Sequence, residues 1–401
     1  MTTTEIRPLA QFAQAPLLLL IIGFLMLQPL STDLYLASLP SLSQVFKVPP
    51  STVQLTLSLF VIGFGSAQLV IGPLSDRYGR RPVLLWGLSL YLLGSVLCGL
   101  APSIEMLIAA RFLQAVGCCS AAMVARAIVR DAWDAEHSVR VIARASTWLS
   151  LAPLIGPILG SYLQVKLGWR AAFAVHATFS SLLLAMTAWR LPETNLHRDP
   201  QATNLRGLLA NFRLLLGARE FWAYALPAAL SYGSLFAFIS GASLVLIRVL
   251  DVPTAYFGYC FAFGVSGYLS GTIVCRRLLA RIGTAGAFRV GSSLSLAAGV
   301  SFLLAVLAGL SHWALVVLAM FLTMCAHGIN FPIGQSGAVA PFPRQAGTAA
   351  GLMGAMAMAV AFLVGTLVAA SFNGTLYPLA LIVAVLGVSI FISVRLLLSR
   401  S

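Results

Sequence analysis

Apolar runs long enough to cross a membrane recur along the whole chain, and they constrain its fold more than any other feature. A helix needs about 20 apolar residues to span the hydrocarbon core of a bilayer. Twelve stretches of this kind lie near residues 15–38, 51–72, 82–101, 105–128, 140–164, 170–190, 221–246, 254–278, 285–309, 312–334, 346–371 and 374–397. The sequence therefore predicts an all-α membrane protein with twelve transmembrane helices.

The scarcity of charge excludes a soluble protein. Hydrophobic residues make up 59% of the chain and charged residues only 9%, whereas a soluble domain carries about 25% charged residues. Such a chain cannot cover a water-exposed surface, so we expect the lipid bilayer to contact most of it. The cysteines predict neither a metal site nor a disulfide framework, because all of them fall in apolar runs without metal-ligand spacing to a histidine: Cys98, Cys118, Cys119, Cys260, Cys275 and Cys325.

The net charge of +14 is a topology signal and not a sign of nucleic-acid binding. Of the 25 basic residues, 20 fall in the N-terminal segment and in every second loop. The alternate loops hold only four, namely Lys47, Lys166, Arg170 and Arg248. Because basic loops stay on the cytoplasmic side, this bias predicts that both termini are cytoplasmic.

A polar segment at 191–220 divides the chain nearly in half. We predict a six-helix half over residues 1–190, a cytoplasmic linker with an amphipathic helix over 191–220, and a second six-helix half over 221–401. Weak internal repetition supports a duplication. Gly79 and Gly283 follow the second and eighth predicted spans, 204 residues apart, and Gly160 and Gly365 lie in the fifth and eleventh spans, 205 residues apart.

The segment GPLSDRYGRRP at 72–82 concentrates charge in the loop after the second span. Gly72 and Gly79 permit tight turns and close helix approach. Asp76 is placed to pair with a nearby arginine or a helix N-terminus. The basic residues of the segment are Arg77, Arg80 and Arg81. We expect this cluster to act as a latch that opens and closes as the two halves move; the alternative is a topology anchor alone.

Two charged residues fall inside predicted spans, Asp33 and Arg111. An ionisable residue inside a span is costly and indicates function. Asp33 is the candidate for carrying a proton. Arg111 keeps its charge and is a candidate partner for Asp33 or for substrate, with Gln114 one turn further along the same helix face. The alternatives are a helix-end aspartate near the outer surface and an arginine whose side chain reaches the membrane surface.

Small residues in the fifth span suggest a hinge or a seal against proton leak. Gly156, Pro157 and Gly160 allow a bend and a close backbone approach. The eleventh span is equally rich in small residues and fits a close partner across the pseudo-symmetry axis. Ordinary packing is the alternative for both.

The lining of a cavity is predicted from aromatic, soft and polar side chains inside the spans. An amphiphilic ligand favours such surfaces. Packing or lipid contact is the alternative for each of these side chains. The candidates are Tyr35, Phe60, Tyr232, Phe236, Phe238, Met353, His327 and Asn330.

Several motifs carry a resemblance to a known family. The pattern G-x-L-x-D-R-x-G-R-R-P at 72–82 resembles the signature of the major facilitator superfamily. STDLYLASLP at 31–40 resembles the first span of its drug:proton antiporter branch, in particular the bicyclomycin and chloramphenicol resistance subfamily. RFLQAVG at 111–117 is similar to a motif associated with proton coupling, with Ala115 where glycine is usual. LAPLIGPILGS at 151–161 is similar to the antiporter motif, with Ser161 replacing a second glycine.

The resemblance covers essentially the whole chain and implies a function. It implies proton-coupled export of small, mostly apolar or amphiphilic drugs by alternating access, in a bacterial inner membrane. It also implies a monomer driven by the proton gradient without a cofactor. A carrier for a polar metabolite such as a nucleoside, amino acid or sugar is the alternative. A membrane enzyme is not supported, because the chain contains no HExxH, GxSxG or P-loop motif.

Overall fold

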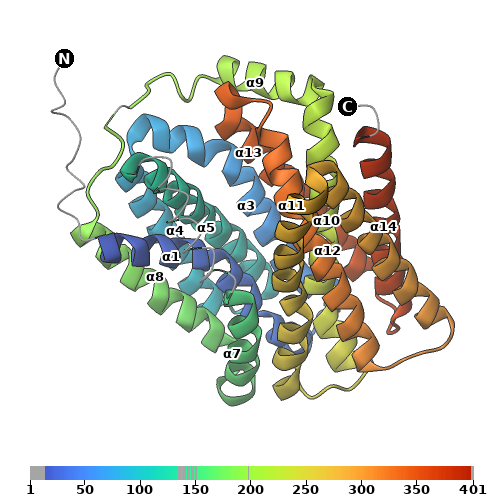
Figure 1. Cartoon of the computed structure of the whole chain (residues 1–401). Helices are drawn as coiled ribbons and strands as arrows, with labels where there is room; N and C mark the ends of the chain where they lie inside the picture. The colour runs from blue at the N-terminus through green and yellow to red at the C-terminus, as the bar shows by residue number, and fades with distance from the viewer. Residues whose placement is uncertain are drawn as a thin grey trace.

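The computed structural model describes residues 14–133, 151–196 and 198–398, together with the single positions 137, 141, 145 and 149. All regular elements in this part of the chain are helical, as the sequence predicts. Two groups of helices lie side by side, and the linker helix α9 crosses above them (Figure 1). The predicted positions of both chain ends, and most of the first half of the predicted span at 140–164, lie outside the described residues.

The first group contains the N-terminal helices. Their bounds are α1 Gln14–Asp33, the short 3₁₀ turn η2 Leu36–Ser38, α2 Leu39–Val45, α3 Pro50–Tyr78, α4 Arg80–Leu100, α5 Ile104–Ala132, α7 Ala152–Leu167 and α8 Arg170–Arg190. α5 packs against α1, α3 and α4, and α8 packs against α4.

The linker and the second group follow. The linker helix is α9 Leu205–Gly217; the second group comprises α10 Arg219–Ser243 with its π-helical extension η3 Leu244–Val249, α11 Thr254–Leu307, α12 Trp313–Val339, the 3₁₀ turn η4 Pro343–Gln345, α13 Ala346–Ser371 and α14 Tyr377–Leu398. α10 and α11 both pack against α12 and α14, and α10 also packs against α13.

The described helices account for the predicted spans. Ten helical stretches are long and apolar enough to cross a membrane, and the longest, Thr254–Leu307, contains two spans. The described part of α7 adds 16 residues of a further span. Helices suit this environment because they satisfy every backbone hydrogen bond internally where no water is present.

The predicted first span is broken in the middle. α1 ends at Asp33, and the chain then passes through η2 into α2 without leaving the stretch Pro16–Val45. Asp33 is thus the last residue of α1 inside this stretch, and η2 and α2 follow it directly.

Two glycines join consecutive spans directly. Gly79, with φ of 104°, is the single residue between α3 and α4, and Gly283, with φ of 68°, bends α11 into two helices. Both conformations favour glycine because a Cβ atom is strained at positive φ. The two positions, 204 residues apart in sequence, thus both have positive φ at the junction of two consecutive spans.

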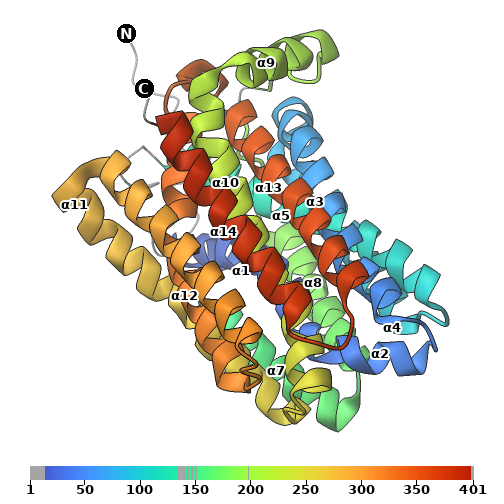
Figure 2. The same cartoon turned by 90° about the vertical axis from the view of Figure 1, so that its right-hand side faces the viewer.

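The two halves meet along two seams. α3 packs against α13, and α7 packs against α11, as the two perpendicular views show (Figures 1 and 2). The small-residue eleventh span is therefore the partner of the second span, while the fifth span pairs with the eighth. We call the side of the molecule with α9 and Gly79 the linker side, and the side with α2 and Gly168 the far side.

Candidate functional site

Asp33 lies where the first span breaks. Its side chain is buried, with 4% of the residue exposed. The carboxylate accepts one hydrogen bond, from Thr32 Oγ1 at 3.0 Å, and forms no ion pair with any residue in the described ranges. It is also the only buried acidic residue among those the structure describes. A carboxyl group this poorly compensated is costly to keep charged.

Arg111 is fully buried in the N-terminal half and does not reach the membrane surface. Its guanidinium donates to Gln114 Oε1 at 2.6 Å, to the carbonyl of Ser31 at 3.0 Å and to the carbonyl of Thr56 at 3.4 Å. Neutral acceptors from α1, α3 and α5 thus hold this cation. The alternative of an arginine that extends to the interface is wrong, because these contacts use its donors inside the bundle.

Aromatic rings enclose the same guanidinium. Its carbon lies 4.3 Å from the centre of the Phe60 ring, 5.1 Å from that of Tyr35 and 5.9 Å from that of Phe173. Such cation–π contacts are strongest where water is excluded. Tyr35, a predicted cavity residue, therefore forms part of the wall around Arg111.

A second layer of hydrogen bonds fixes this arrangement. Gln114 Nε2 donates to Ser95 Oγ at 2.8 Å, and Ser31 Oγ lies 2.6 Å from the hydroxyl of Tyr91. Ser95 and Tyr91 were not expected from the sequence, because serine and tyrosine in apolar spans carry no distinctive spacing. The network ends at the carbonyl of Ser31, two residues before Asp33, and in this structure it does not include the carboxylate.

The glycines of the fifth span bring α7 against this break. A Cβ atom at Gly156 would lie 2.9 Å from Asp33 Cβ, and one at Gly160 would lie 3.0 Å from Leu34 Cα. On the other side, Gly258 of α11 leaves no room for a Cβ beside the backbone of Pro157. This segment of α7 therefore contacts both Asp33 and the opposite half.

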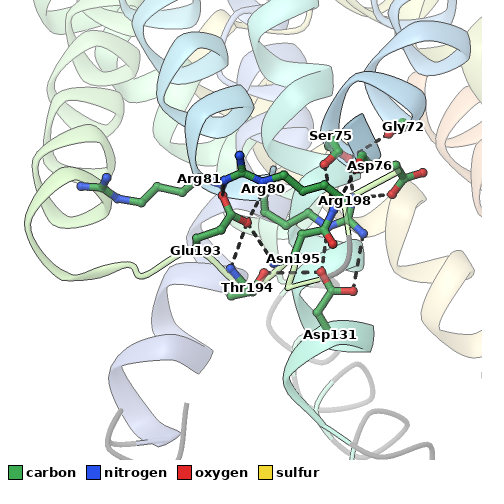
Figure 3. A network of polar contacts seen from close by, with 10 residues as sticks. All are labelled: Gly72, Ser75, Asp76, Arg80, Arg81, Asp131, Glu193, Thr194, Asn195 and Arg198. Carbon is green, nitrogen blue, oxygen red and sulfur yellow. Dashed lines mark hydrogen bonds and ion pairs between the residues drawn. The ribbon is translucent and has the colours of Figure 1, made fainter. Parts of the chain in front are cut away.

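Arg80 is the centre of the charged cluster at the α3–α4 junction (Figure 3). It donates to Asp131 Oδ2 at 2.7 Å, to Asp76 Oδ1 at 2.5 Å and to Ser75 Oγ at 2.8 Å. Although charged, Arg80 is 6% exposed. It therefore ties the end of α3 and the start of α4 to the end of α5.

Glu193 extends this cluster into the linker and was not selected from the sequence. Its carboxylate accepts from the backbone N–H groups of Arg80 at 2.8 Å and Arg81 at 3.2 Å, at the N-terminus of α4. A carboxylate in this position satisfies free N–H groups and interacts favourably with the helix dipole. The signal available in the sequence was an acidic residue directly after the sixth span, on the same side of the membrane as the basic motif.

The linker backbone is attached to the same junction. Asn195 Nδ2 donates to the carbonyl of Asp76 at 3.0 Å, and the backbone N–H of Asp199 donates to the same carbonyl at 3.1 Å. The remaining basic residues of the motif also contact neighbouring segments. Arg77 donates to Thr203 Oγ1 at 2.5 Å, and Arg81 donates to the carbonyl of Ala188 at 2.8 Å.

Gly72 does not have the expected role. It lies inside α3, six residues before its last residue, and a Cβ atom there would meet nothing within 4 Å. Gly72 therefore forms neither a turn nor a close helix contact in this structure. The turn depends on Gly79 alone, because α3 continues to Tyr78.

The other predicted cavity residues lie in separate environments. Tyr232 and His327 contact one another, with ring centres 5.9 Å apart, and Gln28 of α1 donates to the Tyr232 hydroxyl at 3.3 Å. Phe236 is buried against Gly365 of α13. Asn330 instead donates to Ser295 of α11 at 3.0 Å. Of this group, the structure brings together only Tyr232 and His327, beside the first span.

The contacts between the two halves differ between the linker side and the far side. On the far side, Arg248 of η3 donates to the carbonyl of Pro40 in α2, so the two halves are in contact there. On the linker side, a cavity of about 370 Å³ lies between them. Its lining comes from α3, α5, the linker and the start of α13, and includes Gln68, Asp76, Arg130, Asn211, Gln345 and Thr348.

Two packed groups of spanning helices, with a broken first span and charges buried inside the first group, define a membrane transporter that is not an enzyme. The family model of the Major Facilitator Superfamily matches residues 20–366. The chain belongs to this superfamily.

Curated relatives agree with the narrower resemblance. A bicyclomycin resistance protein homolog of Haemophilus influenzae is 30% identical over 90% of this chain and 91% of the relative. A chloramphenicol resistance protein of Pseudomonas aeruginosa is 31% identical over 94% of this chain and 91% of the relative. The resemblance to the bicyclomycin and chloramphenicol resistance subfamily is confirmed by these relatives.

Solved structures agree with the fold. The xylose transporter XylE from Escherichia coli superposes with a TM-score of 0.73 at 15% identity, over 94% of this chain and 96% of that structure. A bacterial homolog of the human lysosomal transporter Spinster superposes with a TM-score of 0.74 at 16% identity, over 96% of this chain and 97% of that structure.

Proposed function

We propose that this protein exports small, mostly apolar or amphiphilic compounds of the bicyclomycin or chloramphenicol kind in exchange for protons. The substrate class is supported by the relatives, whose names describe resistance to these antibiotics. The buried carboxylate of Asp33, placed between the broken first span and the glycines of α7, is the observation that supports proton exchange.

In this proposal Asp33 is protonated in the state described here. Among the residues that the structure describes, the carboxylate has one hydrogen-bond donor and no cation within ion-pair distance, and the guanidinium network of Arg111 ends at Ser31. A buried carboxyl group in this situation favours its neutral form because desolvation penalises the charge. The proton enters from the far side, and access to water from the linker side then favours ionisation of Asp33 and release of the proton on that side, opposite to the movement of the exported compound.

Alternating access follows from the two seams. Far-side contacts are closed here, whereas the linker-side cavity separates the halves. We assign the linker side to the cytoplasm on the basis of the basic loops, with both termini on that side of a bacterial inner membrane. The Arg80 cluster then serves as the cytoplasmic latch. The protein acts as a monomer and uses the proton gradient without a cofactor.

A growth assay tests this proposal. Efflux-deficient bacteria expressing the wild type or Asp33→Asn are exposed to a panel of antibiotics, with protein in the membrane fraction quantified. The wild type should raise tolerance to at least one amphiphilic antibiotic, and Asp33→Asn should abolish the gain at equal abundance. Unchanged drug tolerance together with altered release of a nucleoside, amino acid or sugar would instead identify a metabolite carrier.

A further inference from the structure

A groove of about 870 Å³ follows the seam between α7 and α11 on the outer surface. Its walls come from both halves of the molecule. One wall is a stripe along α7, and the other is the first turns of α11; the lining residues are Ile155, Ile158, Leu159, Tyr162, Val165, Lys166, Ala255, Tyr256 and Tyr259. The contact of Gly258 with the backbone of Pro157 and Ile158 lies beside it.

The groove is apolar along its length and basic at one end. The α7 stripe runs from Ile155 to Lys166, which is about 16 Å of helix at 1.5 Å per residue. That length is close to half of the roughly 30 Å hydrocarbon core. Ile155 is 56% exposed and Tyr162 is 60% exposed, so these side chains are open to the bilayer.

Lys166 is an unusual cation in this chain. It is one of only two lysines, the other being Lys47, whereas the remaining basic residues are arginines. It lies at the far-side end of α7, is exposed and forms no ion pair with the residues that the structure describes. An unpaired amine at the membrane surface, above an apolar groove one leaflet deep, is complementary to an anionic headgroup and its acyl chain.

We propose that this groove binds one phospholipid with an anionic headgroup, such as phosphatidylglycerol, from the far-side leaflet. Its phosphate pairs with Lys166, and an acyl chain lies along α7 between Leu159, Tyr162 and Tyr259. Because the walls belong to different halves, the bound lipid favours the state in which α7 and α11 are in contact. A ligand shifts such an equilibrium only through its different affinity for the two states.

Native mass spectrometry of the full-length protein tests this site, with phosphatidylglycerol and phosphatidylcholine as probes. Lys166→Gln should weaken retention of phosphatidylglycerol by about fivefold, the effect of one basic contact near a headgroup. Lys47→Gln is the matched control, because it removes the only other lysine without touching the groove. Ala255→Trp, at an exposed position, should also reduce retention because the indole fills the groove while Lys166 is kept.

The outcomes are distinct. Selective loss in Lys166→Gln and Ala255→Trp, with Lys47→Gln unchanged, supports the site. Equal retention by all variants, equal loss in Lys47→Gln, or the same affinity for phosphatidylcholine overturns it. The readout is lipid binding, so a failure here leaves the proposed export function untouched, and thermal denaturation in lipid-free detergent verifies that each variant is folded.

Discussion

At the scale of single residues, Asp33 and Arg111 are held in different ways inside the first half. Arg111 is held by three neutral acceptors and three aromatic rings, so its position is fixed. Asp33 has a single hydrogen bond among the described residues and lies at a helix end against Gly156, so little compensates a charge on its carboxyl group. We infer that Arg111 braces the break in α1 and that Asp33 is the group that changes protonation.

Replacing Arg111 with lysine keeps the positive charge but removes the planar, multiple-donor guanidinium group. A single ammonium group cannot reach all three acceptors that the planar guanidinium contacts. Each hydrogen bond to a charged group contributes about 1.5–3 kcal/mol, so we expect the Tm of the purified protein to fall by several degrees and export to be lost. Arg213→Lys, at an exposed position of the linker helix α9, should leave both unchanged. An Arg111→Lys protein with wild-type Tm and activity would refute the bracing role.

At the scale of elements, the proposed latch depends on the backbone conformation of Gly79. Gly79 at φ of 104° places the N-terminus of α4 over the Glu193 carboxylate, whereas Gly72 lies in open space within a helix. We therefore expect a glycine-to-alanine substitution to have opposite effects on stability at Gly79 and at Gly72.

Gly79→Ala should destabilise the protein and impair export. Alanine is strained at this φ, and its Cβ would crowd the Glu193 carboxylate. Gly72→Ala should be neutral or stabilising by up to about 1 kcal/mol, because alanine is the better helix former. Thermal denaturation and drug tolerance of the two variants, compared side by side, provide the measurement. Equal behaviour of the pair would show that the latch does not need the Gly79 turn.

The sequence was sufficient to predict where the helices lie along the chain but not which residues of different helices are in contact. Hydropathy located the spans, and the 72–82 motif located the charged cluster around Arg80, because both depend on local composition and spacing. The break after Asp33, the cap by Glu193 and the isolation of Gly72 depend on where distant helices pack, which the sequence does not state. Phe236 and Asn330, both predicted to line a cavity, lie in different environments for the same reason. An aromatic or amide group in a span packs equally well in several environments, so the sequence does not show which one it enters.

At the scale of the whole molecule, movement requires the seams to open and close. The seam between α7 and α11 is tight because Gly258 has no side chain beside Pro157 and Ile158. The two halves are in contact on the far side in this state. We infer that this contact depends on the close approach of α11 to α7 at Gly258.

Gly258→Leu should therefore prevent far-side closure and stop export. The added side chain has no space at the seam, and overpacking of this kind is destabilising for the closed state. Labelling of far-side cysteines introduced near the seam should increase. Gly207→Leu, which adds the same side chain to the exposed face of α9 where nothing lies within 4 Å, is the control and should transport normally. Normal transport by Gly258→Leu would contradict the assignment of this seam as a moving contact.

The most direct test of the central claim is drug transport in proteoliposomes containing the purified protein, with and without an imposed pH gradient. The wild type should accumulate a transported antibiotic against its gradient only when the pH gradient is present. Asp33→Asn should lose this uphill transport while still exchanging drug down its own gradient, which shows that the protein is folded and binds substrate. Uphill, pH-driven transport by Asp33→Asn at the wild-type rate would contradict the role of Asp33 as the proton carrier.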